Sequence, residues 1–230
     1  NLTLYSEITI KGSAASETIL DFNSTTKFIK IEGDTAEYTS GLIVATQGLT
    51  AIKGIGTSWE SNVVANEFIK ISNVLYKISS VDSNTQLTLS EKYNGSTTDR
   101  IAYGIAKYKT NIIIEDIRIT KGGDTAGAGI GAIDGKFIKD SFIRNCIIDK
   151  ALNTGIIIKN SFNITIDNNK LSNNAKYGID FFSDVFYSFI LNNECNAGIN
   201  AGIIVSGGSD NNTIIGNDCN ENGISGIAIL

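Results

Sequence analysis

Four side chains in one part of the sequence carry groups that act as acids, bases or cations: Lys159, Tyr177, Asp180 and Asp184. Such a set could neutralise an acidic substrate group and remove a nearby proton, since proton transfer needs an ionisable side chain beside the reacting atom. Asp180 and Asp184 could instead hydrolyse a glycosidic bond, which requires a defined separation between two carboxyl groups. The alternative is a solvated contact between Asp180 and Lys159, which contributes little. We treat these four as candidate catalytic residues.

Two aromatic side chains, Trp59 and Phe182, are candidates for binding carbohydrate. An aromatic ring offers a flat apolar face on which a sugar ring can stack. Trp59 is the only tryptophan in the chain, and its alternative role is the centre of a small hydrophobic core.

Oxygen-bearing side chains are dense in residues 207–212 and 216–222, and calcium accepts such ligands. Their spacing matches no defined calcium loop, and ordinary Asn-rich turns account for it better. The chain has no His and no closely spaced pair of Cys residues. We therefore predict no metal site and no cofactor, with calcium as the weaker alternative.

A repeat positions these residues. Four glycines follow one another at intervals of 23, 24 and 24 residues, and each begins a similar apolar phrase: Gly155, Gly178, Gly202 and Gly226. Isoleucine stands twelve residues before each glycine, and Asn stands nine before three of them. A fixed period with matched apolar and Asn positions is typical of a stacked repeat. Short alternating runs separated by Gly, Asn and Ser indicate strands and turns.

Alternation along a strand then assigns the faces of each repeat. Residues one and three positions after each glycine point inward, and residues two and four positions after it point outward. Lys159 and Asp180 are outward, with Asp134 expected near Lys159 on the preceding repeat. We predict that the apolar outward residues form a subunit interface, in a three-fold assembly, or are covered by a segment of the same chain. They are Ile157, Phe182, Ile204 and Ala228.

The repeat phrases resemble those of the pectate-lyase-like superfamily. Examples are Ile166-Asp-Asn-Asn-Lys-Leu-Ser-Asn-Asn and Ile112-Ile-Ile-Glu-Asp-Ile-Arg-Ile-Thr. The resemblance covers residues 1–44 and 108–230 and implies an all-β fold, a right-handed parallel β-helix. It does not specify a function, because the superfamily includes lyases, hydrolases, epimerases, phage tailspikes and passive surface fibres.

Residues 45–107 interrupt the repeat with short alternating runs that predict a small antiparallel β domain. The segment Gly54-Ile-Gly-Thr-Ser-Trp and the segment Tyr76-Lys-Ile-Ser-Ser-Val resemble a small β-module of phage tail and tail-fibre proteins. The resemblance favours a virion protein over a free enzyme.

A second resemblance concerns the candidate catalytic residues. Tyr177-Gly-Ile-Asp180 is similar to the Tyr-Gly-Phe-Asp-Pro-His motif of mannuronan C5-epimerases, which implies catalytic roles for Tyr177 and Asp180. Two phenylalanines replace the motif's Pro-His pair, and Ile204 supplies no second carboxylate one repeat later. Lyases of the superfamily often use Arg or Lys as the base, a role that would fall to Lys159.

Composition excludes some classes of partner. The net charge is −5 and no basic stripe is present, so we expect no nucleic-acid partner. No apolar run reaches the ~20 residues of a membrane-spanning helix. The chain starts at Asn1 and reads as part of a longer protein. Cys195 and Cys219 occupy equivalent repeat positions, where we expect two buried, reduced thiols.

Together these observations favour a virion or extracellular β-helix protein, similar to a phage tailspike or tail fibre. Such a protein would recognise a surface polysaccharide, with or without depolymerising it. A first alternative is a free carbohydrate-active enzyme, either a polysaccharide lyase or a uronate epimerase. A second is a structural filament or adhesin. Enzymatic activity is left open.

Overall fold

The computed structural model describes residues 2–5, 7–23, 27–33, 37–124 and 130–230, which form two compact units. One unit combines Asn1–Glu32 with Lys109–Leu230, and the other is Gly33–Tyr108. The first boundary therefore lies twelve residues before the predicted 44/45 junction. The reason is that β5 (Leu42–Ala45) pairs antiparallel with β6 (Ala51–Ile55), which belongs to the inserted unit.

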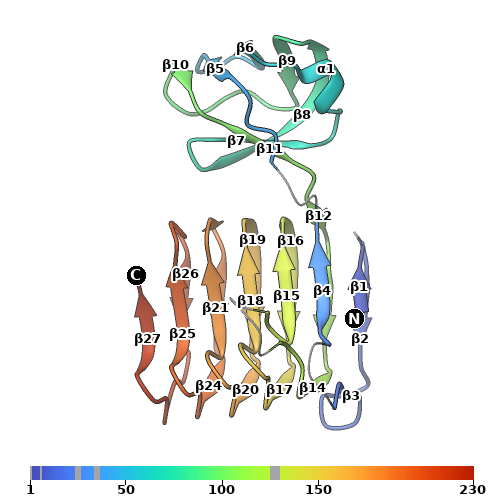
Figure 1. Cartoon of the computed structure of the whole chain (residues 1–230), viewed down its shortest axis with the longest axis vertical. Coiled ribbons are helices and arrows are strands. Elements are labelled where there is room, and N and C mark those ends of the chain that lie inside the picture. Colours follow the sequence, from blue (N-terminus) through green and yellow to red (C-terminus); the bar gives the residue numbers. More distant parts are fainter. Residues whose placement is uncertain (1, 6, 24–26, 34–36, 125–129) are drawn as a thin grey trace. The chain divides into compact units, whose positions relative to one another are not determined.

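The first unit is a parallel β-helix, as predicted. Its successive coils place equivalent strands side by side in sequence order (Figure 1). Three parallel sheets run along the stack, and we call them sheets A, B and C. Sheet A contains β1 (Leu2–Leu4), β4 (Ile29–Glu32), β15 (Ile133–Lys136), β18 (Ile156–Lys159), β21 (Ile179–Phe182), β25 (Ala201–Ser206) and β27 (Ser225–Ile229).

Sheets B and C complete each coil. Sheet B contains β2 (Thr9–Lys11), β13 (Ile113–Glu115), β16 (Ile138–Arg144), β19 (Ser161–Asp167), β23 (Phe189–Leu191) and β26 (Thr213–Ile215), with β12 (Lys109–Thr110) and β22 (Val185–Phe186) beside them. Sheet C contains β3 (Ile19–Asp21), β14 (Arg118–Thr120), β17 (Ile147–Asp149), β20 (Lys170–Ser172) and β24 (Glu194–Asn196).

The core of the β-helix is a set of inward apolar ladders. The predicted inward positions are confirmed after Gly155, Gly178 and Gly202, whereas Ile227 and Ile229, after Gly226, are exposed. Ile156, Ile179 and Ile203 are in register on adjacent coils and are fully buried in the core cluster. The repeating glycines are explained by close approach of the backbone. A Cβ atom on Gly178 would lie 2.6 Å from the carbonyl oxygen of Gly202.

The Asn residues that stand nine positions before the glycines form a ladder across the coils. The side-chain nitrogen of Asn169 donates to Oδ1 of Asn193 at 2.9 Å, and that of Asn193 donates to Oδ1 of Asn217 at 3.0 Å. Asn193 Nδ2 also donates to the carbonyl oxygen of Ile166 at 2.9 Å. These contacts satisfy buried backbone groups where each coil turns from sheet B to sheet C.

The cysteine prediction is half right. Cys195 is buried in register with Leu171, whereas Cys219, on the outermost described coil, is only half-buried. All three cysteines are free thiols.

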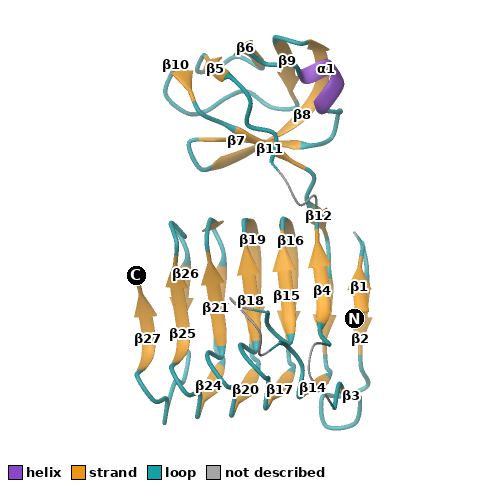
Figure 2. Ribbon diagram, viewed as in Figure 1, coloured by secondary structure: helices purple, strands orange, loops and turns teal. Residues whose placement is uncertain are grey.

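The inserted unit is antiparallel, as predicted, with one short helix (Figure 2). Its further elements are α1 (Trp59–Asn62), β7 (Phe68–Ile71), β8 (Val74–Ser83), β9 (Gln86–Leu89), β10 (Thr98–Ile101) and β11 (Gly104–Ala106). Trp59 is fully buried in the core of this unit, where Nε1 donates to the Tyr103 hydroxyl at 3.0 Å. Its predicted role in stacking on a sugar is therefore wrong, since neither face of the indole reaches solvent.

Candidate functional site

The outward face of sheet A carries two rows of side chains that cross the coils. Strand register aligns Lys30, Asp134, Ile157, Asp180, Ile204 and Ala228 in the first row. It aligns Glu32, Lys136 and Lys159 in the second row, which Phe182 and Ser206 continue on the following coils. Each row is charged on the earlier coils and largely apolar or small on the later ones. Both rows are outward because they alternate with the core positions.

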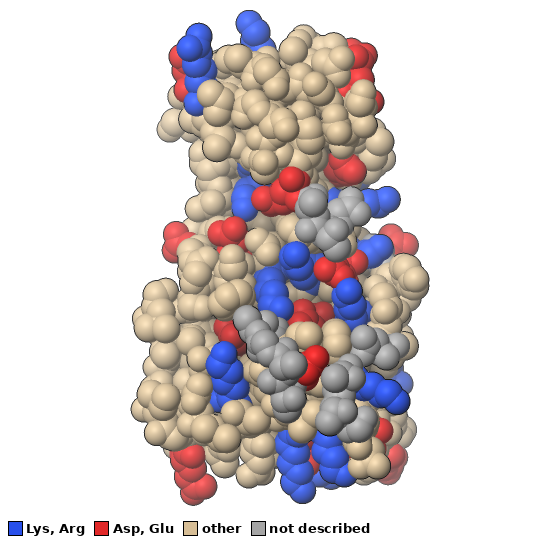
Figure 3. Space-filling model, in the orientation of Figure 1, with Lys and Arg blue, Asp and Glu red and all other residues tan. Residues whose placement is uncertain are grey.

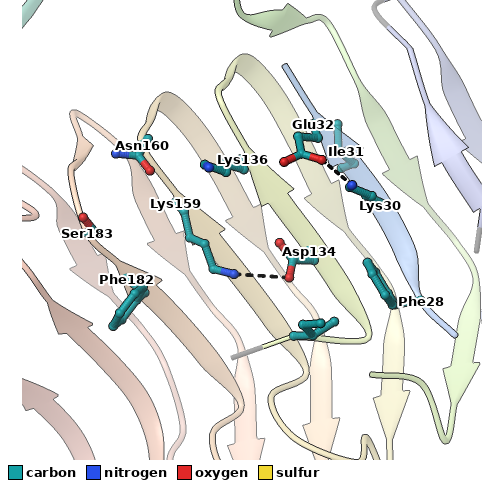
Figure 4. Close-up of a pocket in the computed structure, with 11 residues that line it drawn as sticks. Phe28, Lys30, Ile31, Glu32, Asp134, Lys136, Lys159, Asn160, Phe182 and Ser183 are labelled. Carbon is teal, nitrogen blue, oxygen red and sulfur yellow. Dashed lines mark hydrogen bonds and ion pairs between the residues drawn. The ribbon is translucent and has the colours of Figure 1, made fainter. Parts of the chain in front are cut away.

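A pocket of about 440 Å³ lies over the charged part of these rows. Mixed Lys and Asp/Glu side chains gather on this face of the β-helix in the space-filling view (Figure 3). In the close-up, the Phe28 and Phe182 rings stand at opposite ends of a line of charged side chains (Figure 4). The pocket is lined by Phe28, Lys30, Ile31, Glu32, Ile130, Asp134, Lys136, Lys159, Asn160, Phe182 and Ser183.

Two ion pairs organise the pocket. Lys159 Nζ lies 3.3 Å from Oδ2 of Asp134 on the preceding coil, as expected from the sequence. Lys30 pairs with Glu32 on its own strand. Burial raises the pKa of Asp134, and the Lys159 ammonium opposes that effect. Lys136 Nζ lies 5.1 Å from the centroid of the Phe137 ring, a cation–π contact. The pocket therefore presents three ammonium groups and two carboxylates.

Asp180 lies outside the pocket lining, although it occupies the same row as Asp134. Its side chain is 4% exposed, and Oδ1 is buried without a hydrogen-bond partner among the described residues. Burial raises the pKa of this carboxyl to about 6, and the charges of Lys176 and Lys159 act against the shift. A carboxyl group with a pKa near neutrality could exchange a proton, but here it is removed from the pocket.

The other two catalytic candidates lie elsewhere. Lys176 Nζ sits 4.9 Å from the centroid of the Tyr177 ring. Asp184 lies in the corner between β21 and β22, where the amide nitrogen of Asn160 donates to its Oδ2 at 3.4 Å. The corner turns the chain from sheet A toward sheet B, and neither Asp180 nor Asp184 lines the pocket. Of the predicted catalytic residues, only Lys159 lines the pocket.

The predicted interface stripe is largely covered within the chain. Ile157 is 1% exposed and Ile204 is 7% exposed, so neither needs a partner subunit to bury it. A Cβ atom on Gly131 would lie 3.0 Å from Cγ2 of Ile157, which shows that the backbone at Gly131 packs against this residue. Phe182 is 45% exposed at the edge of the pocket. The interface itself stays a prediction.

Sequence reasoning missed Lys30, Glu32 and Lys136 as pocket residues. Lys30 and Glu32 precede the insertion, so the 24-residue spacing could not connect them to the later coils. A signal was nevertheless present, because Ile29-Lys-Ile-Glu repeats the strand pattern of Ile133-Asp-Gly-Lys. The two strands are paired in register.

Neither a metal-binding cluster nor a membrane-spanning helix occurs among the described residues. Within the described residues, no group of three or more His, Cys, Asp or Glu side chains could hold a metal ion. None of the described helices is long and apolar enough to cross a membrane.

The family model for a right-handed β-helix region matches residues 9–230 of the chain. A comparison with curated protein sequences finds no match.

Solved structures with a similar fold include three phage tailspikes. The tailspike gp61 of Pseudomonas phage phi297 is 11% identical, with a TM-score of 0.58 over 89% of this chain and 39% of its own. The tailspike gp49 of Pseudomonas phage LKA1 is 17% identical, with a TM-score of 0.50 over 89% of this chain and 38% of its own.

The third is the gp54 tailspike of Acinetobacter baumannii bacteriophage AP22, in complex with the A. baumannii capsular saccharide. It is 12% identical, with a TM-score of 0.54 over 94% of this chain and 40% of its own. At these identities the likeness is one of fold, and the chain spans about two fifths of each tailspike.

Proposed function

Because the chain belongs to the right-handed β-helix family, we propose that it recognises a polysaccharide in the pocket on the outward face of sheet A. The pocket's mixture of three lysines, two carboxylates and two terminal phenylalanine rings is the observation that carries the proposal. It is further supported by the fold shared with three phage tailspikes, one of which is in complex with a capsular saccharide.

The lining suits a sugar because a saccharide has two kinds of surface. Ring hydroxyls can accept from the ammonium groups of Lys136 and Lys159 and donate to Glu32. Apolar ring faces can pack against Phe182, which is partly exposed, at one end of the pocket. A few polar groups that fix orientation beside apolar contacts are typical of ligand sites.

The likeness to tailspikes extends the proposal to location and assembly. A polysaccharide-binding β-helix of this kind would act on a virion or at an extracellular surface, and a three-fold assembly would present several copies of the pocket. Several linked copies bind a repeating polymer far more tightly than one copy does.

Cleavage of the saccharide is a second candidate function. The observation that favours it is the pKa of Asp180 of about 6, because a general acid works best when its pKa is near the working pH. Catalysis would require the buried carboxyl to reach the saccharide. Loss of depolymerisation in Asp180→Asn, with thermal unfolding that shows the variant to be at least as stable as the parent protein, would support this candidate.

The experiment for recognition is an array of purified bacterial capsular and O-antigen polysaccharides probed with the full chain. Lys136→Ala and Phe182→Ala should each weaken binding about tenfold, the change produced by 1.4 kcal/mol. Lys150→Ala is the matched control, because Lys150 is exposed at a turn after sheet C. Binding that is equally strong in all three variants would refute the sheet A pocket as the site.

A further inference from the structure

The outward face of sheet B carries aromatic rings that the sheet A pocket does not use. Phe142 is 40% exposed and Phe189 is 37% exposed. Both point outward, because Ile143 and Ile190, the next residues in their strands, lie in the core.

Strand register arranges these rings in an alternating row. Phe142 pairs with Thr165, Thr165 with Phe189, and Phe189 with Thr213. The row therefore reads ring, hydroxyl, ring, hydroxyl across four coils. Two coil steps separate the rings, about 10 Å at the usual spacing of strands. Thr165 and Thr213 are both half-buried, and their strands, β19 and β26, belong to sheet B.

A second row of paired charges runs beside the first. Arg144 Nε donates to Oε2 of Glu115 at 2.7 Å, and Lys11 Nζ lies 2.9 Å from Oε1 of the same carboxylate. The guanidinium carbon of Arg144 also lies 5.9 Å from the centroid of the Phe142 ring. Arg144 is thus held over the aromatic row, and a guanidinium carries five N–H donors.

We infer that this face of sheet B is a second carbohydrate-binding surface, on which an uncharged glycan chain lies along the β-helix axis. Sugar rings would stack on Phe142 and Phe189, and hydroxyl groups would bond to Thr165 and to Arg144. The separation of the rings suits a step of two sugar units along an extended chain. The inference does not depend on the sheet A pocket.

The pattern favours a glycan over a protein partner. The core of a protein interface is a contiguous apolar patch with few charges. Here a threonine separates the rings, and the adjoining row is charged beside Phe142 and becomes apolar only beside Phe189, at Leu191 and Ile215. Those charges are already paired with one another, so an uncharged ligand with many hydroxyl groups fits better than an ionic one.

Saturation-transfer NMR with irradiation of the aromatic protons tests the inference. The probes are cellohexaose, maltoheptaose and the hexamer of N-acetylglucosamine, each with the full chain. At least one probe should receive magnetisation at its ring C–H protons. The double variant Phe142→Ser/Phe189→Ser should bind that probe at least about tenfold more weakly, the change that corresponds to 1.4 kcal/mol.

Tyr5→Ser is the matched control, since it removes an exposed ring that belongs neither to this face nor to the sheet A pocket. It should leave binding of the oligosaccharide probe unchanged. Loss of polysaccharide recognition in Phe182→Ser alone would bear only on the proposed function of the sheet A pocket. Circular dichroism should show that all variants are folded at the temperature of the binding measurement, because the replaced rings are partly exposed.

Three results would overturn the inference. The first is no transfer to any of the three probes, and the second is transfer that the double variant leaves unchanged. The third is a Phe142→Asp variant that converts an oligomer into monomers in sedimentation, since this would make the face an interface between protein copies.

Discussion

Asp134 and Asp180 lie on the same outward row of sheet A, one on each side of Ile157, yet their environments differ. Asp134 accepts a hydrogen bond from Lys159 at 3.3 Å, whereas Oδ1 of Asp180 is buried without a partner among the described residues. On this one face, the carboxyl group of Asp134 is paired and lines the pocket, whereas the carboxyl group of Asp180 is sequestered and does not.

The sequestered carboxyl should make stability depend on pH. Aspartate has a pKa of about 3.9 in an unfolded chain, and burial raises the pKa of Asp180 to about 6. The folded protein therefore binds more protons between these values, so this group lowers stability as pH rises from about 4 to about 6. Asp180→Asn should then increase the free energy of unfolding at pH 7.5 by about 2–3 kcal/mol, and by much less at pH 4.

Urea unfolding of the variant and the parent protein at both pH values measures this effect. The measurement at pH 4 is the control, since an effect of the substitution on packing alone would be the same at both pH values. A variant at position 180 that is less stable than the parent at pH 7.5 would contradict the prediction.

The sequence predicted the fold well because every coil of the β-helix repeats the same local pattern of residues. Each coil places an isoleucine such as Ile166 inside and an amide such as Asn193 at a turn, so spacing alone identifies both. The boundary of the insertion was less predictable. Alternation in Leu42–Ala45 is equally consistent with a coil strand and with the antiparallel pairing that the structure shows.

The site was harder to predict than the fold, because its residues come from coils on both sides of the insertion. Lys159 and Asp134 were expected to meet, and they do. The burial of Asp180 depends on what covers the outward face of sheet A, and strand alternation contains no information about that cover. An outward position is therefore not the same as an exposed one.

Buried amides of the Asn ladder should contribute strongly to stability. Asn193 Oδ1 accepts from the backbone nitrogen of Asn169 at 3.0 Å, and its amide nitrogen donates to Ile166. Asn193→Ala would leave both backbone groups buried without partners, at a cost of about 1–3 kcal/mol for each. We expect a loss of about 2–5 kcal/mol in chemical denaturation.

Asn196→Ala is the control for this ladder, because its Oδ1 accepts from the exposed backbone nitrogen of Asn220. Its effect should stay within about 0.5 kcal/mol, as for most surface substitutions. Equal losses in the two variants would show that burial of the amide is not what matters.

The three thiols should differ in reactivity. Burial raises the pKa of Cys146 to about 11, and the hydrogen bond with Cys219 raises that of Cys195. The Cys195 thiol lowers the pKa of Cys219, which is also the most accessible of the three. A thiol reagent at pH 8 should modify one cysteine of the folded protein, since the thiolate is the reactive form.

Titration with a chromogenic disulfide reagent counts the reactive thiols, and Cys219→Ser should abolish the rapid phase. Cys146→Ser is the matched variant that should leave the rapid phase intact. Rapid modification of two or three thiols in the folded parent protein would contradict the prediction, because it would show that Cys146 or Cys195 is accessible to the reagent.

The cover of Ile157 should come from its own chain and not from another subunit. Its side chain is 1% exposed in the single chain and lies against Gly131. Ile157→Ala should cost about 2–4 kcal/mol, because it removes buried methyl groups and leaves a cavity. If the cover is intramolecular, this loss will be the same at every protein concentration. Phe182→Ala, at a partly exposed position two residues beyond Asp180, should cost much less. Denaturation over a hundredfold concentration range measures both variants, and a loss at position 157 that changes with concentration would instead place this residue at a subunit interface.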